Sequence, residues 1–150
     1  MDLLLWRHAE AEEGPVDLQR KLTARGEKQA LAMAAWIKKN QPKKLCILVS
    51  PAVRCQQTAK ALGLAFETVR GLAPDAGVSE LIAATGWPTA SAAVLVVGHQ
   101  PTLGHMASLA LAGQEADWTI KKGALWWLNR RERAGESQTV LRASITPDLL

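Results

Sequence analysis

Cysteine and long hydrophobic runs are both scarce in this sequence. The two cysteines, Cys46 and Cys55, are too few for a disulfide framework. We expect both to be buried free thiols, which fits a reducing compartment. No stretch of about 18 apolar residues is present, so we expect no membrane span. The apolar start Leu3–Trp6 is too short for a signal peptide and follows the acidic Asp2. These absences predict a cytoplasmic protein that does not bind a membrane.

Motifs for metal binding and for nucleic-acid binding are also missing. The chain has no HExxH motif, no pair of cysteine ligands and no aspartate-rich cluster, so we expect no metal and no cofactor. The net charge is +4, but the basic residues form separate pairs such as Lys38-Lys39 and Lys121-Lys122 rather than a stripe. This weak bias suits an anionic ligand and does not indicate nucleic acid.

Short apolar runs alternate with longer segments of helical periodicity. The strands that we expect are Leu3–Arg7, Leu45–Ser50, Phe66–Arg70, Ala93–Gly98, Ala124–Leu128 and Thr139–Ile145. The helices that we expect are Ala24–Lys39, Pro51–Leu62, Val78–Thr85 and Pro101–Leu111. The runs LCILV and AVLVV are apolar at every position, which is typical of strands buried on both faces of a parallel sheet.

This alternation predicts an α/β fold, a three-layer α/β/α sandwich around a mostly parallel sheet. The last two strand-like runs are joined by a charged, glycine-containing loop, so we expect a C-terminal hairpin or edge addition. The length of 150 residues suits one domain, 1–150. Thr23 is the expected N-cap of the first helix, and Ser50 that of the second, with Pro51 as its first residue.

Titratable residues follow three of the expected strands. Arg7-His8 follows the first, Arg54 lies one helical turn beyond the second, and Gly98-His99 follows the run Ala93–Val97. Because ligands of open parallel sheets bind outside the carboxyl ends of the strands, we expect these groups to converge. Helix N-termini at the same edge add positive dipole ends. The arrangement predicts a site for a phosphate-sized dianion.

Each of these residues, taken alone, is compatible with a structural role. His105, one turn into the last helix, is expected in the core or behind the site. However, two of the three histidines occupy equivalent strand ends, and that coincidence favours a shared functional site.

Four ordered motifs resemble those of the histidine phosphatase superfamily, which has the phosphoglycerate-mutase-like fold, and more narrowly the SixA-type phosphohistidine phosphatases. The motifs are RHAEAE (Arg7–Glu12), RKLTARG (Arg20–Gly26), VSPAVRCQQTA (Val49–Ala59) and VVGHQPTL (Val96–Leu103). Their order and spacing, together with the chain length, agree with that family.

The resemblance implies that His8 is a nucleophile that is transiently phosphorylated on a ring nitrogen. It also implies that Arg7, Arg54 and His99 bind the phosphoryl oxygens, with Arg20 as a further contact. Charge on three equatorial oxygens calls for several fixed donors, and the planar arginine fork suits that role. We expect the neighbouring arginines to lower the pKa of His8 and keep it neutral.

The sequence departs from the family pattern in two ways. Ala9 replaces the glycine that follows the catalytic histidine, and no residue is a secure general acid, although Asp75 and Glu80 are candidates. An imidazole leaves with little protonation, because its conjugate acid has a pKa near 6.5, whereas an alkoxide needs an acid. We therefore expect N-phosphohistidine on a protein, such as a histidine-phosphotransfer domain, as substrate.

Two alternatives remain open. One is a phosphatase or mutase for a small phosphorylated metabolite, with Asp75 or Glu80 as acid. The other is a phosphate-binding module without catalysis. The sequence leaves the oligomeric state open.

Overall fold

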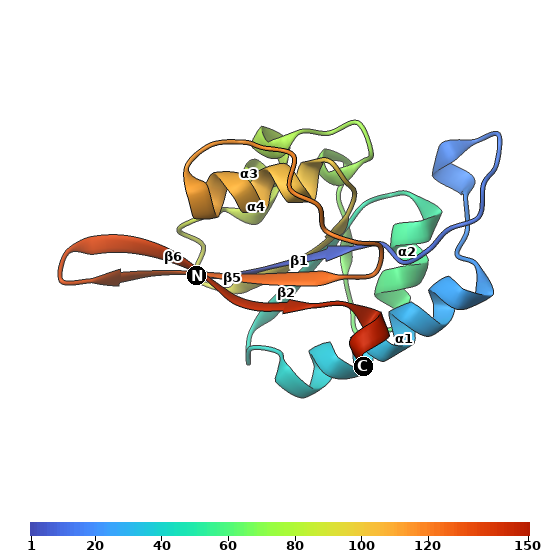
Figure 1. Cartoon of the computed structure of the whole chain (residues 1–150), viewed down its shortest axis with the longest axis horizontal. Helices are drawn as coiled ribbons and strands as arrows, with labels where there is room; N and C mark the ends of the chain where they lie inside the picture. Colours follow the sequence, from blue (N-terminus) through green and yellow to red (C-terminus); the bar gives the residue numbers. More distant parts are fainter.

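A six-stranded mixed sheet forms the centre of the molecule (Figure 1), in a computed structural model that describes residues 1–150. The strands are β1 (Asp2–Arg7), β2 (Leu45–Val49), β3 (Glu67–Thr68), β4 (Ala93–Gly98), β5 (Leu125–Arg133) and β6 (Glu136–Ile145). Their order is β3-β2-β4-β1-β5-β6. The pairs among β1 to β4 are parallel, and β5 and β6 are added antiparallel beside β1. The mostly parallel sheet with a C-terminal hairpin is confirmed.

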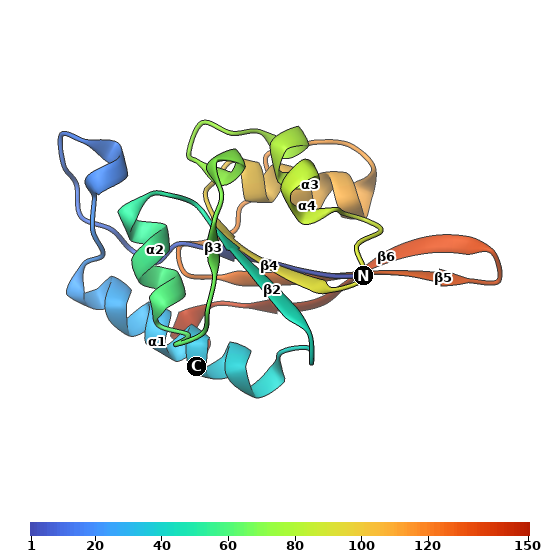
Figure 2. The ribbon, with the colours of Figure 1, turned by 180° about the vertical axis from the view of Figure 1, so that it is seen from behind.

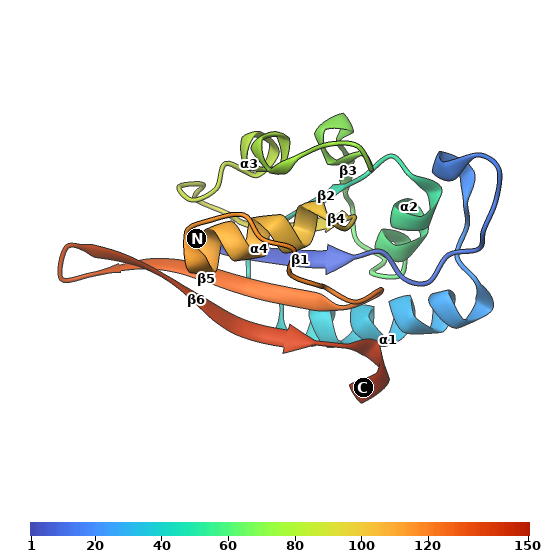
Figure 3. The same ribbon diagram turned by 45° about the horizontal axis from the view of Figure 1, so that its top comes forward.

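Helices cover both faces of the sheet, as Figures 2 and 3 show. They are α1 (Ala24–Asn40), α2 (Val53–Lys60), α3 (Val78–Thr85) and α4 (Thr102–Ala112). The apolar side chains of α1 and α2 share one core cluster, and those of α3 and α4 share the other. Short 3₁₀ turns span Asp17–Gln19, Arg70–Leu72 and Pro147–Leu149. No helix has the length and apolarity that a bilayer crossing requires.

Strand β1 shows why an apolar run without alternation lies in the middle of the sheet. Leu3 and Leu5 enter the core under α3 and α4, whereas Leu4 and Trp6 enter the core under α1 and α2. Successive side chains of a strand point to opposite faces, so both faces must be apolar here. The Trp6 indole N–H is buried but donates to the Gly123 carbonyl (3.0 Å).

The expectation that LCILV is buried throughout, Cys46 included, is wrong. Cys46 is exposed, whereas Cys55 on α2 is fully buried. By strand alternation Cys46 shares a face with Leu48, which packs in the core of α3 and α4. The buried part of that face begins further along the strand, so the start of β2 is left in contact with solvent.

Of the two expected helix N-caps, one is found and the other differs. Helix α1 has Thr23 as its N-cap, as expected, with the hydroxyl accepting from Gly26 N (2.9 Å). Helix α2 begins at Val53, and its N-cap is Ala52 rather than Ser50. The Ser50 hydroxyl accepts from Ala52 N (3.2 Å) and contacts His99 instead.

The C-terminal hairpin is longer than the apolar pattern indicated. The charged segment after Leu128 continues as paired strand up to a turn at Ala134-Gly135, where both residues have positive φ. That backbone matches the type I′ turn favoured by hairpins. The hairpin tip is solvent-exposed, so its strands need no apolar side chains. A search for hydrophobic runs therefore does not predict this part of the strands.

Candidate active site

The parallel pairing of β1 with β4 brings the two histidines of the sequence motifs together. The register aligns Arg7 with Gly98, and His8 N donates to the Gly98 carbonyl (3.1 Å). The ring centroids of His8 and His99 are 5.4 Å apart, with a tilt of 54°. Both side chains are buried. The predicted convergence at the carboxyl ends of the strands is therefore found.

The His8 ring is oriented by its own backbone neighbourhood. Its Nδ1 lies 2.8 Å from the Ala9 carbonyl oxygen, an acceptor, so we assign the proton to Nδ1 and the free lone pair to Nε2. Burial is the main cause that lowers the pKa of His8 to about 4. The carbonyl hydrogen bond raises the pKa, while the charges of the nearby arginines lower it further. The ring is thus neutral near neutral pH.

Ala9 occupies the family's glycine position without strain. It is fully buried beside Leu22 and Ala30, and its φ is not positive. The Ala9 N–H donates to the Thr58 hydroxyl (3.1 Å), which donates to the Arg54 carbonyl (2.7 Å). Helix α2 therefore holds the backbone just beyond His8 in place.

Two arginines flank the histidine pair. Arg54 is 4% exposed, and its Nη2 lies 3.3 Å from Nδ1 of His99. Arg7 Nη1 donates to the Ile120 carbonyl (2.9 Å). The Nε–H groups of both arginines are buried and have no hydrogen-bond partner. Buried cationic donors without partners are costly, and an anion would satisfy them.

His99 is held by residues that precede and begin α2. Its Nε2 lies 2.7 Å from Ser50 Oγ and 3.5 Å from Cys55 Sγ. Because Arg54 offers only donors to Nδ1, the hydrogen bonds place the His99 proton on Nε2. Burial, followed by the positive charges of His8 and Arg54, lowers the pKa of His99 to about 3.

Asp17 is a site residue that sequence reasoning missed. From the 3₁₀ turn it accepts through Oδ2 from Arg54 Nη2 (3.1 Å) and through Oδ1 from Arg20 Nη1 (3.0 Å). Its backbone carbonyl accepts from Arg54 Nη1 (2.8 Å). The hydrogen bond from Arg20 is the main cause that lowers the pKa of Asp17. No local pattern marks this carboxylate, because its role depends on how the loop folds over α2.

Arg20 lies at the edge of the cluster. Its Nε donates to the Glu12 carbonyl (2.8 Å), and its side chain is 21% exposed. Its charge contributes to the lowered pKa of His8.

Neither candidate acid joins the cluster through a hydrogen bond. The Glu80 carboxylate caps α3, accepting from Gly77 N (3.0 Å) and from the Ser79 hydroxyl (3.2 Å). These backbone and side-chain hydrogen bonds lower the pKa of Glu80, so it holds a proton poorly. Asp75 is exposed in the loop before α3 and makes no side-chain hydrogen bond or ion pair.

The third histidine, His105, was expected in the core or behind the site, and that expectation is wrong. It is part-exposed on α4, and its Nε2 lies 2.6 Å from Oδ1 of the exposed Asp117. No group of three or more His, Cys, Asp or Glu side chains is arranged to hold a metal ion.

Comparisons with solved structures give the same fold. The protein histidine phosphatase SixA, solved in complex with tungstate, has a TM-score of 0.79 and 26% identity, with 99% of both chains covered. A phosphoserine phosphatase from Entamoeba histolytica has a TM-score of 0.71 at 18% identity, covering 99% of this chain and 98% of its own. The second likeness shows the shared phosphoglycerate-mutase-like fold alone.

Comparisons of sequence place the chain in a family. An uncharacterized protein from Picosynechococcus is 34% identical over 124 residues, which cover 76% of this chain and 75% of that protein. The family model of the histidine phosphatase superfamily (branch 1) matches residues 3–82, a range that contains His8 and Arg54. The chain therefore belongs to the histidine phosphatase superfamily.

Proposed function

We propose that the protein is a phosphatase that hydrolyses N-phosphohistidine on a protein, through a phosphohistidine intermediate on His8. One observation carries the proposal: a neutral imidazole with its free Nε2 lies within a cluster of His99, the buried Arg54 and the part-buried Arg7. Such a cluster offers a nucleophile and fixed donors for a tetrahedral oxyanion at the same place. The tungstate complex of the similar SixA protein supports the same ligand class.

In the first step, the Nε2 lone pair of His8 attacks phosphorus, and the bond from phosphorus to the substrate imidazole breaks. Arg7 and Arg54 donate to the equatorial oxygens and stabilise their charge in the transition state. His99 adds a third donor once the incoming dianion favours protonation of its Nδ1. The bond from Nδ1–H to the Ala9 carbonyl keeps the ring oriented and stabilises the positive charge that develops on it. The leaving imidazole takes up a proton from solvent.

In the second step, a water molecule attacks phosphorus of phospho-His8. The P–Nε2 bond breaks, inorganic phosphate forms, and the electron pair returns to Nε2. The same donors serve both steps, because the charge again lies on the three equatorial oxygens. His8 is left neutral and ready for another substrate.

The substrate class follows from the leaving group. Glu80 is occupied as a helix cap and Asp75 is exposed, so neither is held ready to protonate an alkoxide. An imidazole, whose conjugate acid has a pKa near 6.5, leaves without such an acid. The absence of a positioned acid therefore supports phosphohistidine over a phosphate monoester as the substrate. The free thiols Cys46 and Cys55 fit our placement of the reaction in the cytoplasm.

A metabolite phosphatase is the second candidate, and one observation favours it. The loop that carries Asp75 packs close to His99, since Ala73, Ala76 and His99 line one small cavity. A movement of this loop would bring a carboxyl group toward a leaving oxygen. In that case Asp75→Asn would slow turnover of phosphoserine or a sugar phosphate, whereas phosphohistidine turnover would be unaffected.

The test uses a histidine-phosphotransfer domain carrying ³²P-phosphohistidine. We expect the wild-type protein to release phosphate and to carry an acid-labile, alkali-stable label. We expect no label on His8→Ala and a normal label on His105→Ala, which replaces the histidine outside the cluster. Saturable phosphate binding without any label would instead indicate a binding module without catalysis.

Two further measurements complete the test. Turnover of phosphate monoesters alone would refute the leaving-group argument. We also expect full activity in EDTA, because the arginines beside the histidines would repel a cation; strong inhibition by EDTA would contradict this.

A further inference from the structure

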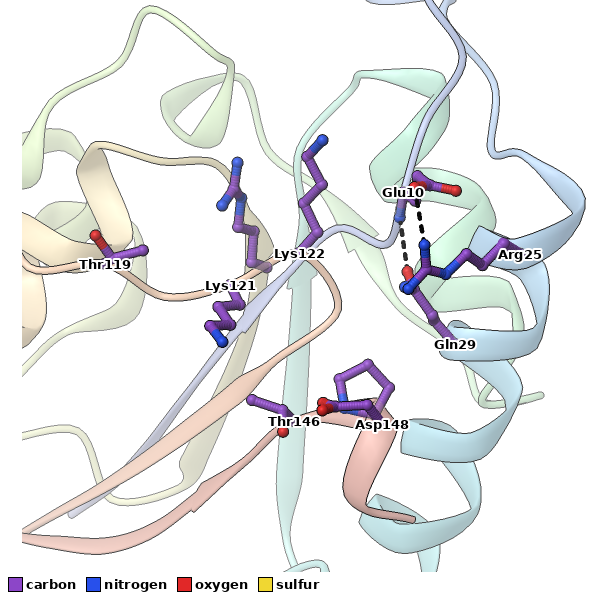
Figure 4. Close-up of a pocket in the computed structure, with 10 residues that line it drawn as sticks. Glu10, Arg25, Gln29, Thr119, Lys121, Lys122, Thr146 and Asp148 are labelled. Atoms are coloured by element: carbon purple, nitrogen blue, oxygen red, sulfur yellow. Dashed lines mark hydrogen bonds and ion pairs between the residues drawn. The ribbon is translucent and has the colours of Figure 1, made fainter.

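A polar cleft of about 380 Å³ lies beside the candidate active site, and of its lining residues the proposed reaction uses only Arg7. Figure 4 shows Lys121 and Lys122 on one side of this cleft and Glu10, Arg25 and Gln29 on the other. Its remaining lining residues are Arg7, Thr119, Thr146, Pro147 and Asp148. No hydrophobic side chain lines the cleft, so it suits a strongly polar ligand.

The turn that carries Lys121 and Lys122 is fixed to the end of β1. Gly123 N donates to the His8 carbonyl (2.9 Å), and Arg7 N donates to the Ala124 carbonyl (3.0 Å). Arg7 Nη1 also donates to the Ile120 carbonyl (2.9 Å). The two lysines are therefore held next to the nucleophile by backbone bonds on both sides of the turn, and Arg7 belongs to both the cleft and the histidine cluster.

Positive charge exceeds negative charge in this cleft. Its cations are Arg7, Arg25, Lys121 and Lys122, and its only carboxylates are Glu10 and Asp148. Glu10 is engaged already, because it accepts from the Thr23 hydroxyl (2.8 Å) and lies 3.9 Å from Arg25. None of the ion pairs in the molecule involves Lys121 or Lys122. Both ammonium groups are thus available to a second anionic group.

We propose that this cleft binds an acidic segment of the phosphoprotein substrate, with Lys121 and Lys122 contacting its carboxylates while the phosphoryl group lies against His8. The inference rests on the proposed function and adds to it the sequence context that the enzyme prefers. A phosphohistidine with glutamate or aspartate side chains nearby can fill both sites at once. The second contact then becomes intramolecular, which strengthens binding without any change in the reacting groups.

The size of the effect follows from the exposure of the lysines. Exposed ion pairs are individually weak, so loss of both lysine contacts corresponds to a rise in KM on the order of tenfold. The attraction is screened, with a Debye length of about 8 Å at physiological ionic strength. Added salt should therefore reduce the preference for an acidic substrate.

The experiment compares three substrates: a phosphohistidine peptide flanked by glutamates, the same peptide with glutamines, and phosphoramidate. The variant is Lys121→Ala/Lys122→Ala. The matched control is Lys43→Ala/Lys44→Ala, which removes the same charge. These two lysines lie just before the N-terminal end of β2, whereas the candidate active site lies at the carboxyl ends of the strands. We expect the first variant to raise KM for the glutamate peptide about tenfold, with kcat unchanged. Its kinetics on the other two substrates should match those of the wild type, and the control variant should match on all three.

Several results would overturn the proposal. If Lys121→Ala/Lys122→Ala lowers kcat/KM equally on all three substrates, the lysines support the catalytic cluster itself. If the control variant lowers kcat/KM for the glutamate peptide by the same factor, only net charge matters. A lysine-dependent preference for a small metabolite with two phosphates, but not for the glutamate peptide, would assign the cleft to that metabolite.

A binding measurement separates this proposal from the proposed function. If phosphohistidine is not turned over at all, the proposed function fails. Fluorescence anisotropy of the unphosphorylated glutamate peptide still tests the cleft. Weaker binding by Lys121→Ala/Lys122→Ala than by the control supports the acidic-segment site, and equal binding overturns it.

Discussion

The buried histidine pair should make the folded protein sensitive to mild acid. The pKa of His8 falls from 6.5 to about 4, and that of His99 falls from 6.5 to about 3. Below pH 6.5 the two histidines bind protons in the unfolded chain but stay neutral in the folded protein. Stability is therefore complete above pH 6.5 and is lost as the pH falls toward the folded pKa values.

The magnitude follows from these values. Between pH 7 and pH 4.5, each histidine should lower the free energy of unfolding by about 2–3 kcal/mol, since one pKa unit is worth about 1.4 kcal/mol. The pair would together cost about 5 kcal/mol, a large part of the stability of a typical domain. His8→Asn should remove about half of this pH dependence, and the double variant His8→Asn/His99→Asn should remove nearly all of it.

The assay is urea unfolding at both pH values, followed by tryptophan fluorescence in chloride buffer. Phosphate and sulfate are left out, because an anion bound at the cluster would stabilise protonated histidines. The carboxylates contribute equally to all variants, so they cancel in the comparison. An unchanged pH dependence in His8→Asn would refute the reasoning, because His8 would then have the same pKa in the folded protein as in the unfolded chain, and burial would not be lowering it.

Three substitutions test the remaining contacts. Arg54→Lys keeps the charge but loses the planar fork, so kcat/KM on phosphoramidate should fall about 10²–10³-fold. A fall of less than about tenfold would contradict the role of Arg54 as a donor to the phosphoryl oxygens. Thr58→Val leaves the buried Ala9 N–H without an acceptor and should destabilise by about 1–3 kcal/mol, visible as a lower urea midpoint. Gly26→Ala would place a Cβ 2.0 Å from the Glu10 carbonyl oxygen, so the melting temperature and the activity should both fall; an unchanged melting curve would contradict the contact.

The strands and the ends of the strands could be predicted because burial leaves a local mark. An apolar run that ends in Arg7-His8 or in Gly98-His99 marks the point where the strand ends and polar side chains begin. The hairpin beyond Leu128 could not be predicted in this way, because exposed paired strands need no apolar pattern. Cys46 was misjudged for the converse reason: an apolar residue in a strand is buried only where a helix covers it.

The roles of polar residues could likewise be predicted only where a local motif marks them. Arg54 could be found from its motif, but its pairing with Asp17 (3.1 Å between Nη2 and Oδ2) depends on the fold of the intervening loop. Ser50 was read as a helix cap from its place before Pro51. Its stronger partner is His99, 2.7 Å away and on another strand. Local patterns cannot carry such contacts, because they join segments that meet only after folding.

The sequence by itself determined which segments are buried and which cationic and imidazole groups stand where those segments end. The tertiary structure decided the distances among these groups, the protonated nitrogen of His99 and the position of the Lys121-Lys122 turn beside Arg7. The physical reason is the separation along the chain of the residues that interact. Periodicity and composition act between neighbours along the chain, whereas Arg7 and Ile120, 113 positions apart, are joined only when the sheet has formed.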